Sequence, residues 1–410
     1  MKPRVGIEKL GIYPASMSLD MSRLCEARGH DLADIRDTMM IDQRSVNPPW
    51  EDPITMAVNA ALPMLTEEDR ACIELLLVGS ESGVDQEKPM STWVHRYLGL
   101  KPRCRNVELK HACYSGTAGL QLAASWIASG TAPGAKALVV TTDQSRMHLG
   151  KPWEYVMGAG AAAVLVSDQP RVLELELGKY GVCTQEVSDL TRPTSRVETG
   201  NSETSLLSYM EGLEGAYADY VEHAGEPVDF DTYFKKNVYH IPFAGLTFRA
   251  HRALLRSFTT IPRSEAWSHF ERKSLAAASY ARRMNGTYSS STMVGLAGTI
   301  ENSTDLDPGD RIGIFSYGSG SCAEFYSGLI CPEARDTVRA ARLPEILDGR
   351  YALTVREYEE AERERTCYVD CGDFQPSTDG FNGWYDAHYR GKGYLVFQGC
   401  EEHYRRYAWS

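Results

Sequence analysis

The apolar residues of the first 170 positions form two kinds of pattern. Short continuous runs predict strands, and runs with apolar residues three or four positions apart predict helices. The predicted strands are residues 5–12, 73–78, 137–141 and 161–166, with helices over residues 53–65 and 119–129. Strands that alternate with helices predict an α/β fold in which helices cover a mixed, largely parallel sheet. This half ends near the polar residues 168–170.

A second half begins with another strand-like run. It continues with a polar, turn-rich stretch, two helical patterns and a pair of strands around a glycine-rich turn, at residues 172–177, 188–208, 247–258, 264–285, 311–317 and 322–330. Residues 356–365 alternate in charge, which predicts a solvated helix face. One hydrophobic core stops growing at roughly 250–300 residues. We therefore expect two halves, residues 1–168 and 169–410, which are alike in order but show no fixed-period repeat.

Composition narrows the class of protein. The chain is 43% hydrophobic and 24% charged, as in ordinary folded proteins. A net charge of −12 argues against nucleic acid as a partner. No signal-peptide core or membrane-length apolar run is present, so we expect a cytoplasmic protein without membrane contact. The ten cysteines include no CxxC pair, and they predict neither a metal site nor disulfides.

Cys113 is the first candidate for a reactive side chain. It lies in HACYSGTAGL, residues 111–120, between a strand-like run at 104–109 and the predicted helix from 119. The positive end of a helix favours a thiolate and can hold a thioester oxygen. From the local pattern alone, a buried cysteine that packs as a small hydrophobe is an equally good interpretation.

Other segments carry residues that suit acyl transfer by a thiol. Glu81, in GSES, follows an apolar strand, where burial raises a carboxyl pKa toward that of a useful base. His240, in HIPF, sits in a proline-braced turn, and Asp189, in SDLTRP, can orient a catalytic group. The SYGSG turn at 316–320 can present backbone N–H groups. Taken one at a time, each of these features has a simpler interpretation. Glu81 also fits a solvated glutamate, His240 a core histidine, Asp189 a turn aspartate and SYGSG an ordinary glycine turn.

Taken together, the motifs of Glu81, Cys113 and His240 and the SYGSG turn, which follow one another in this order, resemble those of the hydroxymethylglutaryl-CoA synthase family. The resemblance extends from the first strand to about residue 330 and is weaker beyond it. GAGAAAV, residues 158–164, and SYGSG are shared more widely among thiolase-fold condensing enzymes. The resemblance implies a thiolase-like α/β fold, with two related halves in α-β-α-β-α layers, and a homodimer.

The resemblance also implies a mechanism. Cys113 accepts an acetyl group, and Glu81 removes a methyl proton to form an enolate. The enolate adds to a β-ketoacyl thioester with the help of His240, and water then frees the acyl group. Oxyanion donors would be the N–H of Cys113 and one from residues 318–321. Substrate contacts are expected from Asp189, Ser316, Tyr317, Gly318, Ser319 and Asn285, with no metal and no tightly bound cofactor.

Some positions depart from the usual family pattern. Primary-metabolism members usually carry a Lys near the coenzyme A phosphates after HIPF, whereas residues 244–252 read AGLTFRAHR. That segment resembles the polyketide subgroup that installs β-branches. It implies that the acetyl donor and the β-ketoacyl acceptor are both bound to the phosphopantetheine arms of acyl carrier proteins. Met147 replaces a common Tyr, and Asn285-Gly286 moves the family's Asn by one position.

Carrier proteins are acidic, so a chain of charge −12 needs a local basic surface to meet them. Residues 249–283 contain eight Lys or Arg against two Glu. Ordinary solvated helix faces are the alternative interpretation. The predicted carrier contacts are Arg249, Arg252, Arg256, Arg263, Arg272 and Lys273.

Two other functions fit parts of the pattern. An initiating ketoacyl synthase shares the fold and the cysteine, but it forms its carbanion by decarboxylation and needs no base, so Glu81 argues against it. A catalytically silent relative would bind carrier proteins as a scaffold. The presence of Cys113, Glu81 and His240 together disfavours that interpretation.

Overall fold

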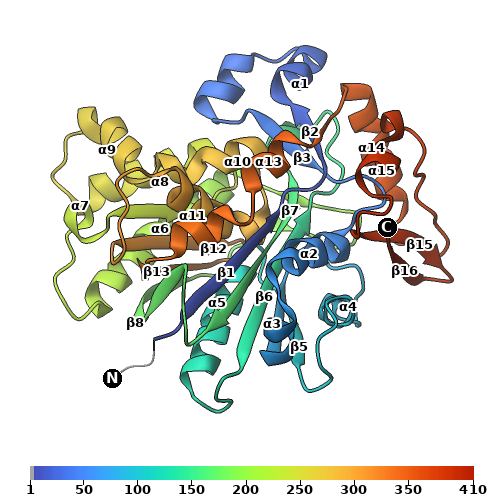
Figure 1. Cartoon of the computed structure of the whole chain (residues 1–410). Coiled ribbons are helices and arrows are strands. Elements are labelled where there is room, and N and C mark those ends of the chain that lie inside the picture. Colours follow the sequence, from blue (N-terminus) through green and yellow to red (C-terminus); the bar gives the residue numbers. More distant parts are fainter. Residues whose placement is uncertain (1–3) are drawn as a thin grey trace.

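A nine-stranded sheet runs through the molecule in the order β11-β12-β13-β8-β1-β7-β6-β4-β5 (Figure 1). The computed structural model describes residues 4–410. The strands are β1 (Gly6–Tyr13), β4 (Ile73–Gly79), β5 (Arg105–Leu109), β6 (Lys136–Gln144), β7 (Ala159–Ser167), β8 (Leu173–Thr184), β11 (Lys236–Tyr239), β12 (Arg311–Gly318) and β13 (Cys322–Ile330). All four strands predicted in the first half are present.

The sheet has two parts that join at one short contact. β1 pairs with β7 along its length but with β8 only at Gly6 and Ile7. A Cβ on Gly6 would lie 2.0 Å from the carbonyl oxygen of Leu173, so only glycine permits this approach. The ends of the two parts are alike, because the inner helix α5 (Ser115–Ala128) leads directly into β6 as the inner helix α11 (Ser291–Asn302) leads directly into β12, and each strand then returns antiparallel.

Helices form three layers around the two parts of the sheet (Figure 1). α5 (Ser115–Ala128) and α11 (Ser291–Asn302) pack between them, in one buried cluster with residues of both parts. α2 (Pro53–Ala61) and α4 (Met90–Tyr97) cover the outer face of the first part. α6 (Ser202–His223) and α8 (Ala244–Phe258) cover that of the second. The expected α-β-α-β-α layering is present.

The sheet is mixed, but the prediction that it is largely parallel is wrong. Only β4–β5, β4–β6 and β11–β12 are parallel, and the other neighbouring pairs are antiparallel. Neither the β6–β7 nor the β12–β13 connection contains a crossover α-helix, and strands joined directly in this way return antiparallel.

Two predicted stretches in the second half have a different structure. The turn-rich stretch at 188–208 contains β9 (Leu190–Thr191) and β10 (Thr199–Gly200) but ends inside α6, which begins at Ser202. Asn201 caps this helix by accepting hydrogen bonds from Glu203 and Thr204. The helical pattern at 264–285 is broken into α9 (Ala266–Lys273) and α10 (Ala278–Met284).

The charged segment at 356–365 is not simply a solvated helix face. It lies in α14 (Val355–Cys367), one side of which is buried against the rest of the molecule. Glu362 accepts hydrogen bonds there from Arg44 at 3.2 Å and from Arg365 at 2.5 Å. Removing one partner from such a network leaves a buried charge uncompensated, so these residues hold the C-terminal region in place.

The remaining elements surround this core. They are β2 (Met17–Asp20), α1 (Met21–Arg28), β3 (Gln43–Val46), α3 (Glu67–Cys72), α7 (Phe230–Tyr233), α12 (Ala334–Arg339), α13 (Leu343–Asp348), β14 (Tyr351–Ala352), α15 (Trp384–His388), β15 (Leu395–Glu401) and β16 (Tyr404–Trp409). β15 and β16 pack beside α2, where Arg405 and Tyr407 both contact Asp52. Within residues 4–410, no helix combines the length and apolar character needed to cross a membrane.

Candidate functional site

The three candidate catalytic residues follow strands that run parallel to a neighbour. Glu81 comes after β4, Cys113 after the adjacent β5, and His240 directly after β11. Parallel strands end at the same edge of a sheet, where ligands of open α/β folds bind. The two parts of the sheet thus present their carboxyl edges to a common site.

Cys113 and Glu81 are in direct contact. The Cys113 thiol donates a hydrogen bond to Oε2 of Glu81 over 3.3 Å. α5 begins at Ser115, so Cys113 lies close to a helix N-terminus, as predicted. The thiol and the carboxylate therefore form one proton-sharing unit.

The resting charge of Cys113 differs from the expectation. Burial and the neighbouring Glu81 carboxylate raise the pKa of the Cys113 thiol well above its usual value, so the prediction of a resting thiolate is wrong. Burial raises the pKa of Glu81 to about 7, while the Arg192 guanidinium opposes this shift. A neutral thiol thus faces a carboxyl group that changes charge near neutral pH.

Arg192 is a site residue that the sequence analysis did not identify. Its guanidinium lies 3.6 Å from Oε1 of Glu81 and 3.1 Å from Oε1 of Glu198, and it donates to the Glu81 carbonyl oxygen at 2.9 Å. Glu198 also contacts Nε2 of His148 at 3.1 Å. Arg192 lies three residues after Asp189 in the same motif, so a search of that segment for a cation would have found it.

Asp143 is a second residue that sequence reasoning missed. This buried carboxylate, near the end of β6, accepts hydrogen bonds from the Glu81 N–H at 2.9 Å and from the hydroxyls of Ser80 and Ser82 at 3.0 and 2.9 Å. The Ser289 hydroxyl is a further donor. Asp143 therefore fixes the loop that carries Glu81. An acidic residue at the end of the strand next to β4 was the available signal.

His240 is held rigidly on the other side of the site. The backbone N–H of His240 donates a hydrogen bond to the Phe315 carbonyl oxygen at 2.7 Å, and the backbone carbonyl oxygen of His240 accepts one from the Tyr209 hydroxyl at 2.8 Å. Nδ1 lies 2.6 Å from the Ser291 hydroxyl, which leaves Nε2 for a ligand. Burial lowers the pKa of His240 to about 3, so the imidazole is neutral at neutral pH.

A cavity of about 450 Å³ joins these residues. Cys113 and His240 both line it, while Glu81 contacts the thiol from a neighbouring cavity. Most of its remaining wall is apolar, with Trp153, Met157, Leu206, Pro242, Phe243 and Leu246. The sulfur is therefore reachable along an apolar space large enough for an acyl chain.

Asp189, Tyr317 and Ser319 also line this cavity. The Asp189 carboxylate is occupied, because it accepts hydrogen bonds from the Tyr317 hydroxyl at 2.9 Å and from the Gly320 N–H at 3.0 Å. Asp189 thus shapes the SYGSG turn, and its two hydrogen bonds leave it little freedom to bind substrate.

Gly318 and Ser316 support the turn from behind. A Cβ on Gly318 would lie 2.6 Å from the His111 carbonyl oxygen and 2.6 Å from Tyr114 Cβ, so the missing side chain lets the turn approach the Cys113 loop. Ser316 is fully buried, and its hydroxyl has no partner among residues 4–410. Neither residue is on the cavity wall.

Two departures from the family pattern lie outside the cavity. Asn285 is buried with a φ of +67°, and its side-chain amide donates to the Tyr155 carbonyl oxygen. It does not line the cavity, although the next residue, Gly286, does. Met147 is 40% exposed and is likewise not part of the wall.

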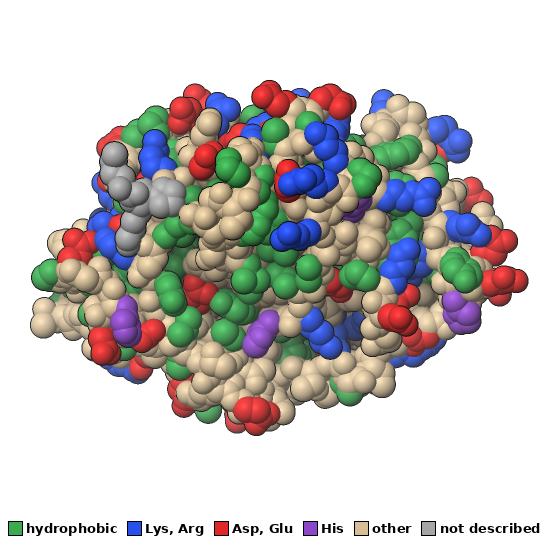
Figure 2. Space-filling view, turned by 90° about the horizontal axis from the view of Figure 1, so that it is seen from below, with side chains coloured by type: hydrophobic (Ala, Val, Ile, Leu, Met, Phe, Trp, Pro, Cys, Tyr) green, Lys and Arg blue, Asp and Glu red, His purple; other side chains and the backbone are tan. Residues whose placement is uncertain are grey.

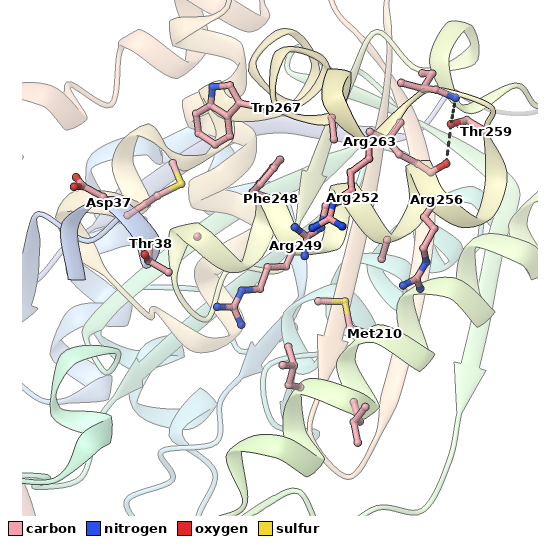
Figure 3. Close-up of a pocket in the computed structure, with 18 of the residues that line it drawn as sticks. Asp37, Thr38, Met210, Phe248, Arg249, Arg252, Arg256, Thr259, Arg263 and Trp267 are labelled. Atoms are coloured by element: carbon pink, nitrogen blue, oxygen red, sulfur yellow. Dashed lines mark hydrogen bonds between the residues drawn. The ribbon is translucent and has the colours of Figure 1, made fainter. Parts of the chain in front are cut away.

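Four of the six predicted carrier contacts surround a third cavity, of about 1010 Å³ (Figure 3). Arg249, Arg252 and Arg256 project from α8, and together with Arg263 and with Met210 of α6 they line this space. Arg249 and Leu206 line both this space and the Cys113 cavity, so the two adjoin.

The other two predicted contacts lie elsewhere. Arg272 donates to Ser268 O of its own helix at 3.1 Å, and Lys273 donates to Phe234 O at 2.9 Å. The basic cluster is therefore the four arginines alone. The face in Figure 2 carries both acidic and basic side chains, so the net charge is not spread as a uniform acidic surface.

Models of one family match most of the chain. The N-terminal model of hydroxymethylglutaryl-coenzyme A synthase matches residues 2–170, and the C-terminal model matches residues 250–408. The chain is 39% identical, over 86% of its length and 87% of the relative, to the polyketide biosynthesis 3-hydroxy-3-methylglutaryl-ACP synthase PksG of Bacillus subtilis. It is 33% identical to the hydroxymethylglutaryl-CoA synthase of Enterococcus faecalis, over 87% and 90% of the two chains.

Solved structures of the same kind are similar throughout. The HMG synthase of the curacin biosynthetic pathway, in complex with acetyl donor-ACP, superposes with a TM-score of 0.95 at 38% identity. That match covers 99% of this chain and 100% of the other. PksG from Bacillus subtilis gives a TM-score of 0.94 at 35% identity, with 99% of each chain covered. The predicted thiolase-like fold is confirmed by these similarities.

Proposed function

Because the chain belongs to the hydroxymethylglutaryl-CoA synthase family, we propose that it adds an acetyl unit to the β-ketone of a carrier-bound polyketide intermediate and so installs a β-branch. One observation carries this proposal. The Cys113 thiol lies 3.3 Å from the largely buried carboxylate of Glu81, and the thiol is on the wall of an apolar cavity that His240 also lines. The complex of the curacin synthase with acetyl donor-ACP supports an acyl carrier protein as the donor.

Acylation begins with the thiol proton. Glu81 is placed to take this proton as Cys113 Sγ attacks the acetyl thioester of the donor. The C–S bond of the donor breaks, and the phosphopantetheine thiol leaves with a proton. Loss of the proton from Glu81 to solvent restores the carboxylate, which its pKa of about 7 allows at neutral pH.

Condensation uses the same carboxylate. Glu81 removes a proton from the acetyl methyl group, and the enolate carbon forms a bond to the ketone carbon of the acceptor. The ketone oxygen becomes a hydroxyl, for which His240 Nε2 is the proposed donor. The neutral imidazole polarises the ketone through an Nε2–H hydrogen bond and regains from solvent the proton that it gives. Glu81 loses the methyl proton to solvent, so both groups return to their starting charge.

The enolate oxygen needs N–H donors. In the SYGSG turn and the residue after it, the amides of Gly320 and Ser321 are already bound to Asp189 and Gln185. We assign the oxyanion donors to the backbone amides of Cys113 and Ser319, which make no hydrogen bond among residues 4–410 and belong to residues that line the cavity. The sequence-based role of Asp189 changes accordingly, from substrate contact to support of the turn that carries Ser319.

The four-arginine cavity is the proposed docking site for both donor and acceptor carrier proteins. It is basic, it adjoins the Cys113 cavity, and it carries the partly exposed aromatic ring of Trp267. The phosphopantetheine arm would pass from it toward Cys113, and the reaction as written needs no tightly bound cofactor. We also propose a homodimer, with an interface that leaves this cavity open, and a division of each chain after residue 168.

Intact-mass measurement with loaded carrier proteins tests the function. With an acetyl-carrier protein, we expect one acetyl group on Cys113, which Cys113→Ala abolishes. Addition of an acetoacetyl-carrier protein should then convert the acceptor to a hydroxymethylglutaryl-type product. Reaction with malonyl donors but not with acetyl donors would instead establish a ketoacyl synthase, and no acylation with either would indicate a silent carrier-binding protein.

A further inference from the structure

Glu81 lies at the wall of a cavity that Cys113 does not line. Glu81 lines a separate cavity of about 520 Å³, together with His111, Thr184, Thr191 and Arg192. Cys113 instead lines the apolar cavity. Leu190 and Ser319 contribute to both walls and thus form the partition between the two spaces.

The two cavities differ in chemistry. Most residues that line the second one have polar side chains, namely Glu81, Lys110, His111, Thr184, Gln185, Glu186, Thr191, Arg192, Ser319 and Ser321. Its volume is many times the roughly 30 Å³ that one water occupies in the liquid. Such a space holds water, whereas the apolar cavity suits an acyl chain.

One residue that lines this polar space, His111, carries an imidazole nitrogen without a protein partner among residues 4–410. This nitrogen, Nε2, is buried. Burial also lowers the pKa of His111, so the ring is neutral at neutral pH. Buried polar atoms without a protein partner are ordinarily satisfied by water.

The proposed function creates a need for such a route. After condensation, the new acyl group joins Cys113 to the acceptor, so the phosphopantetheine arm fills the apolar cavity. Water must still reach the Cys113 thioester. We propose that the polar cavity at Glu81 is the entry route for the hydrolytic water, separate from the path of the carrier arm. This inference rests on the proposed condensation.

The release step balances without another reactant. The water oxygen forms a bond to the thioester carbonyl carbon, and a water proton passes to the Glu81 carboxylate. The bond from that carbon to Cys113 Sγ breaks, and Sγ takes the proton from Glu81. The products are a free carboxyl group on the carrier-bound chain and the thiol–carboxylate pair seen in the structure.

Filling the polar cavity tests the route. Thr184 and Thr191 are exposed residues on different strands at its wall, and neither belongs to the proposed catalytic machinery. We expect Thr184→Trp, and independently Thr191→Trp, to leave acetylation of Cys113 unchanged but to slow hydrolysis about tenfold. The protein–carrier adduct should then accumulate, as a single covalent species in intact-mass spectra after mixing with acetyl- and acetoacetyl-carrier protein.

Val182→Trp provides the matched control. Val182 lies two residues before Thr184 on the same face of β8, is already exposed, and does not line the cavity. This variant should release product at the normal rate. Normal release in both folded threonine variants, with condensation intact, would overturn the water route but leave the proposed function standing. Failure of the unaltered protein to acetylate or condense would overturn both.

Discussion

Glu81 lies between a thiol that must lose a proton and an arginine that favours its charged form. Burial raises its pKa, and Arg192 limits that rise. Glu198 competes with Glu81 for the Arg192 guanidinium. The guanidinium lies 3.1 Å from the Glu198 carboxylate and 3.6 Å from the Glu81 carboxylate. Arg192 and Glu198 are therefore positioning residues that set the proton affinity of the base without touching substrate.

This arrangement predicts opposite effects on pH dependence. Condensation needs the Glu81 carboxylate, so its rate should fall as pH drops below about 7. Arg192→Gln removes the charge that lowers the Glu81 pKa, so the acidic limb of the pH–rate profile, where the rate falls, should move to higher pH. Glu198→Gln removes a charge that raises it and should move the limb to lower pH. Single-turnover condensation rates from pH 5.5 to 8.5 measure both shifts.

Arg196→Gln is the control for this series. Arg196 is exposed and pairs with Asp370, away from Glu81. Its pH profile should match that of the unaltered protein. If Arg192→Gln and Glu198→Gln shift the profile in the same direction, the charges of this pair do not tune Glu81.

Elements differ in how well the sequence predicts them. The strands β4, β6 and β7 carry apolar runs because both faces are covered, and β1 is apolar except at Glu8 and Lys9; all four were predicted. α6 was missed because its first turn is polar and belongs to the turn-rich stretch. Its apolar residues do recur at helical spacing, at Leu206, Tyr209, Leu213, Tyr217 and Tyr220.

The site was predictable only in part. Cys113, Glu81 and His240 each follow a strand within a distinctive motif, and the structure brings them together. Arg192 and Asp143 act through contacts with Glu81 from more than 60 positions away, and no local pattern encodes those contacts. The broken pattern at 264–285 illustrates the same limit, because tertiary packing decides where α9 ends and α10 begins.

A hydrogen-bonded histidine chain links α8 and α9 to β11. Tyr239 O–H lies 2.8 Å from His251 Nδ1, and His251 Nε2 lies 2.7 Å from His269 Nδ1. His269 Nε2 contacts Asp231 at 2.8 Å. All four groups are satisfied if both rings are neutral and each donates toward Asp231. Lys273 and Arg272 are the neighbouring cations, and they disfavour a further positive charge.

Acid should therefore weaken this link. Burial lowers the pKa of His251 to about 3. Below about pH 6.5 the unfolded chain therefore binds the proton more readily than the folded protein, and the free energy of unfolding decreases as the pH is lowered. Between pH 6.5 and 5.0, His251 accounts for about 2 kcal/mol of this loss. We expect His251→Phe to be less stable at pH 7.5 but to show a correspondingly flatter pH dependence in urea denaturation.

His30→Gln is the control, because His30 is exposed and outside this chain of hydrogen bonds. Its slope of stability against pH should equal that of the unaltered protein. An unchanged slope in His251→Phe would show that the buried histidines do not govern acid sensitivity.

The whole molecule has a net charge of −12 but concentrates four arginines beside the entrance to the Cys113 cavity. Within the described part of the chain, residues 4–410, the exposed Arg252 and Arg263 make no salt bridge that an acidic partner would have to break, whereas Arg256 already contacts Glu214. Charge complementarity of this kind speeds encounter and is weakened by salt.

Charge reversal tests this surface. Arg252→Glu and Arg263→Glu should each raise KM for an acetyl-carrier protein about tenfold at low ionic strength. The effect should shrink in high salt and be absent with a small acetyl thioester that lacks the carrier. Arg272→Glu makes the same charge change away from the cavity and should have little effect. Equal effects of all three variants would show that net charge matters and the cavity does not.

The proposed homodimer is a property of the whole molecule that its mass in solution tests. Static light scattering should give twice the chain mass of 45.6 kDa for the proposed homodimer. A mass equal to one chain at micromolar concentration would contradict it.

The most direct measurement is the intact mass of the Glu81→Gln variant during reaction with acetyl- and acetoacetyl-carrier proteins. Removing the carboxylate charge lowers the Cys113 pKa, because Glu81 is one cause of its rise, so the thiol can ionise without the lost proton acceptor. We therefore predict that acetyl-Cys113 forms and persists while condensation falls by at least about 100-fold, the usual contribution of a general base. Normal condensation in this folded variant would contradict the account.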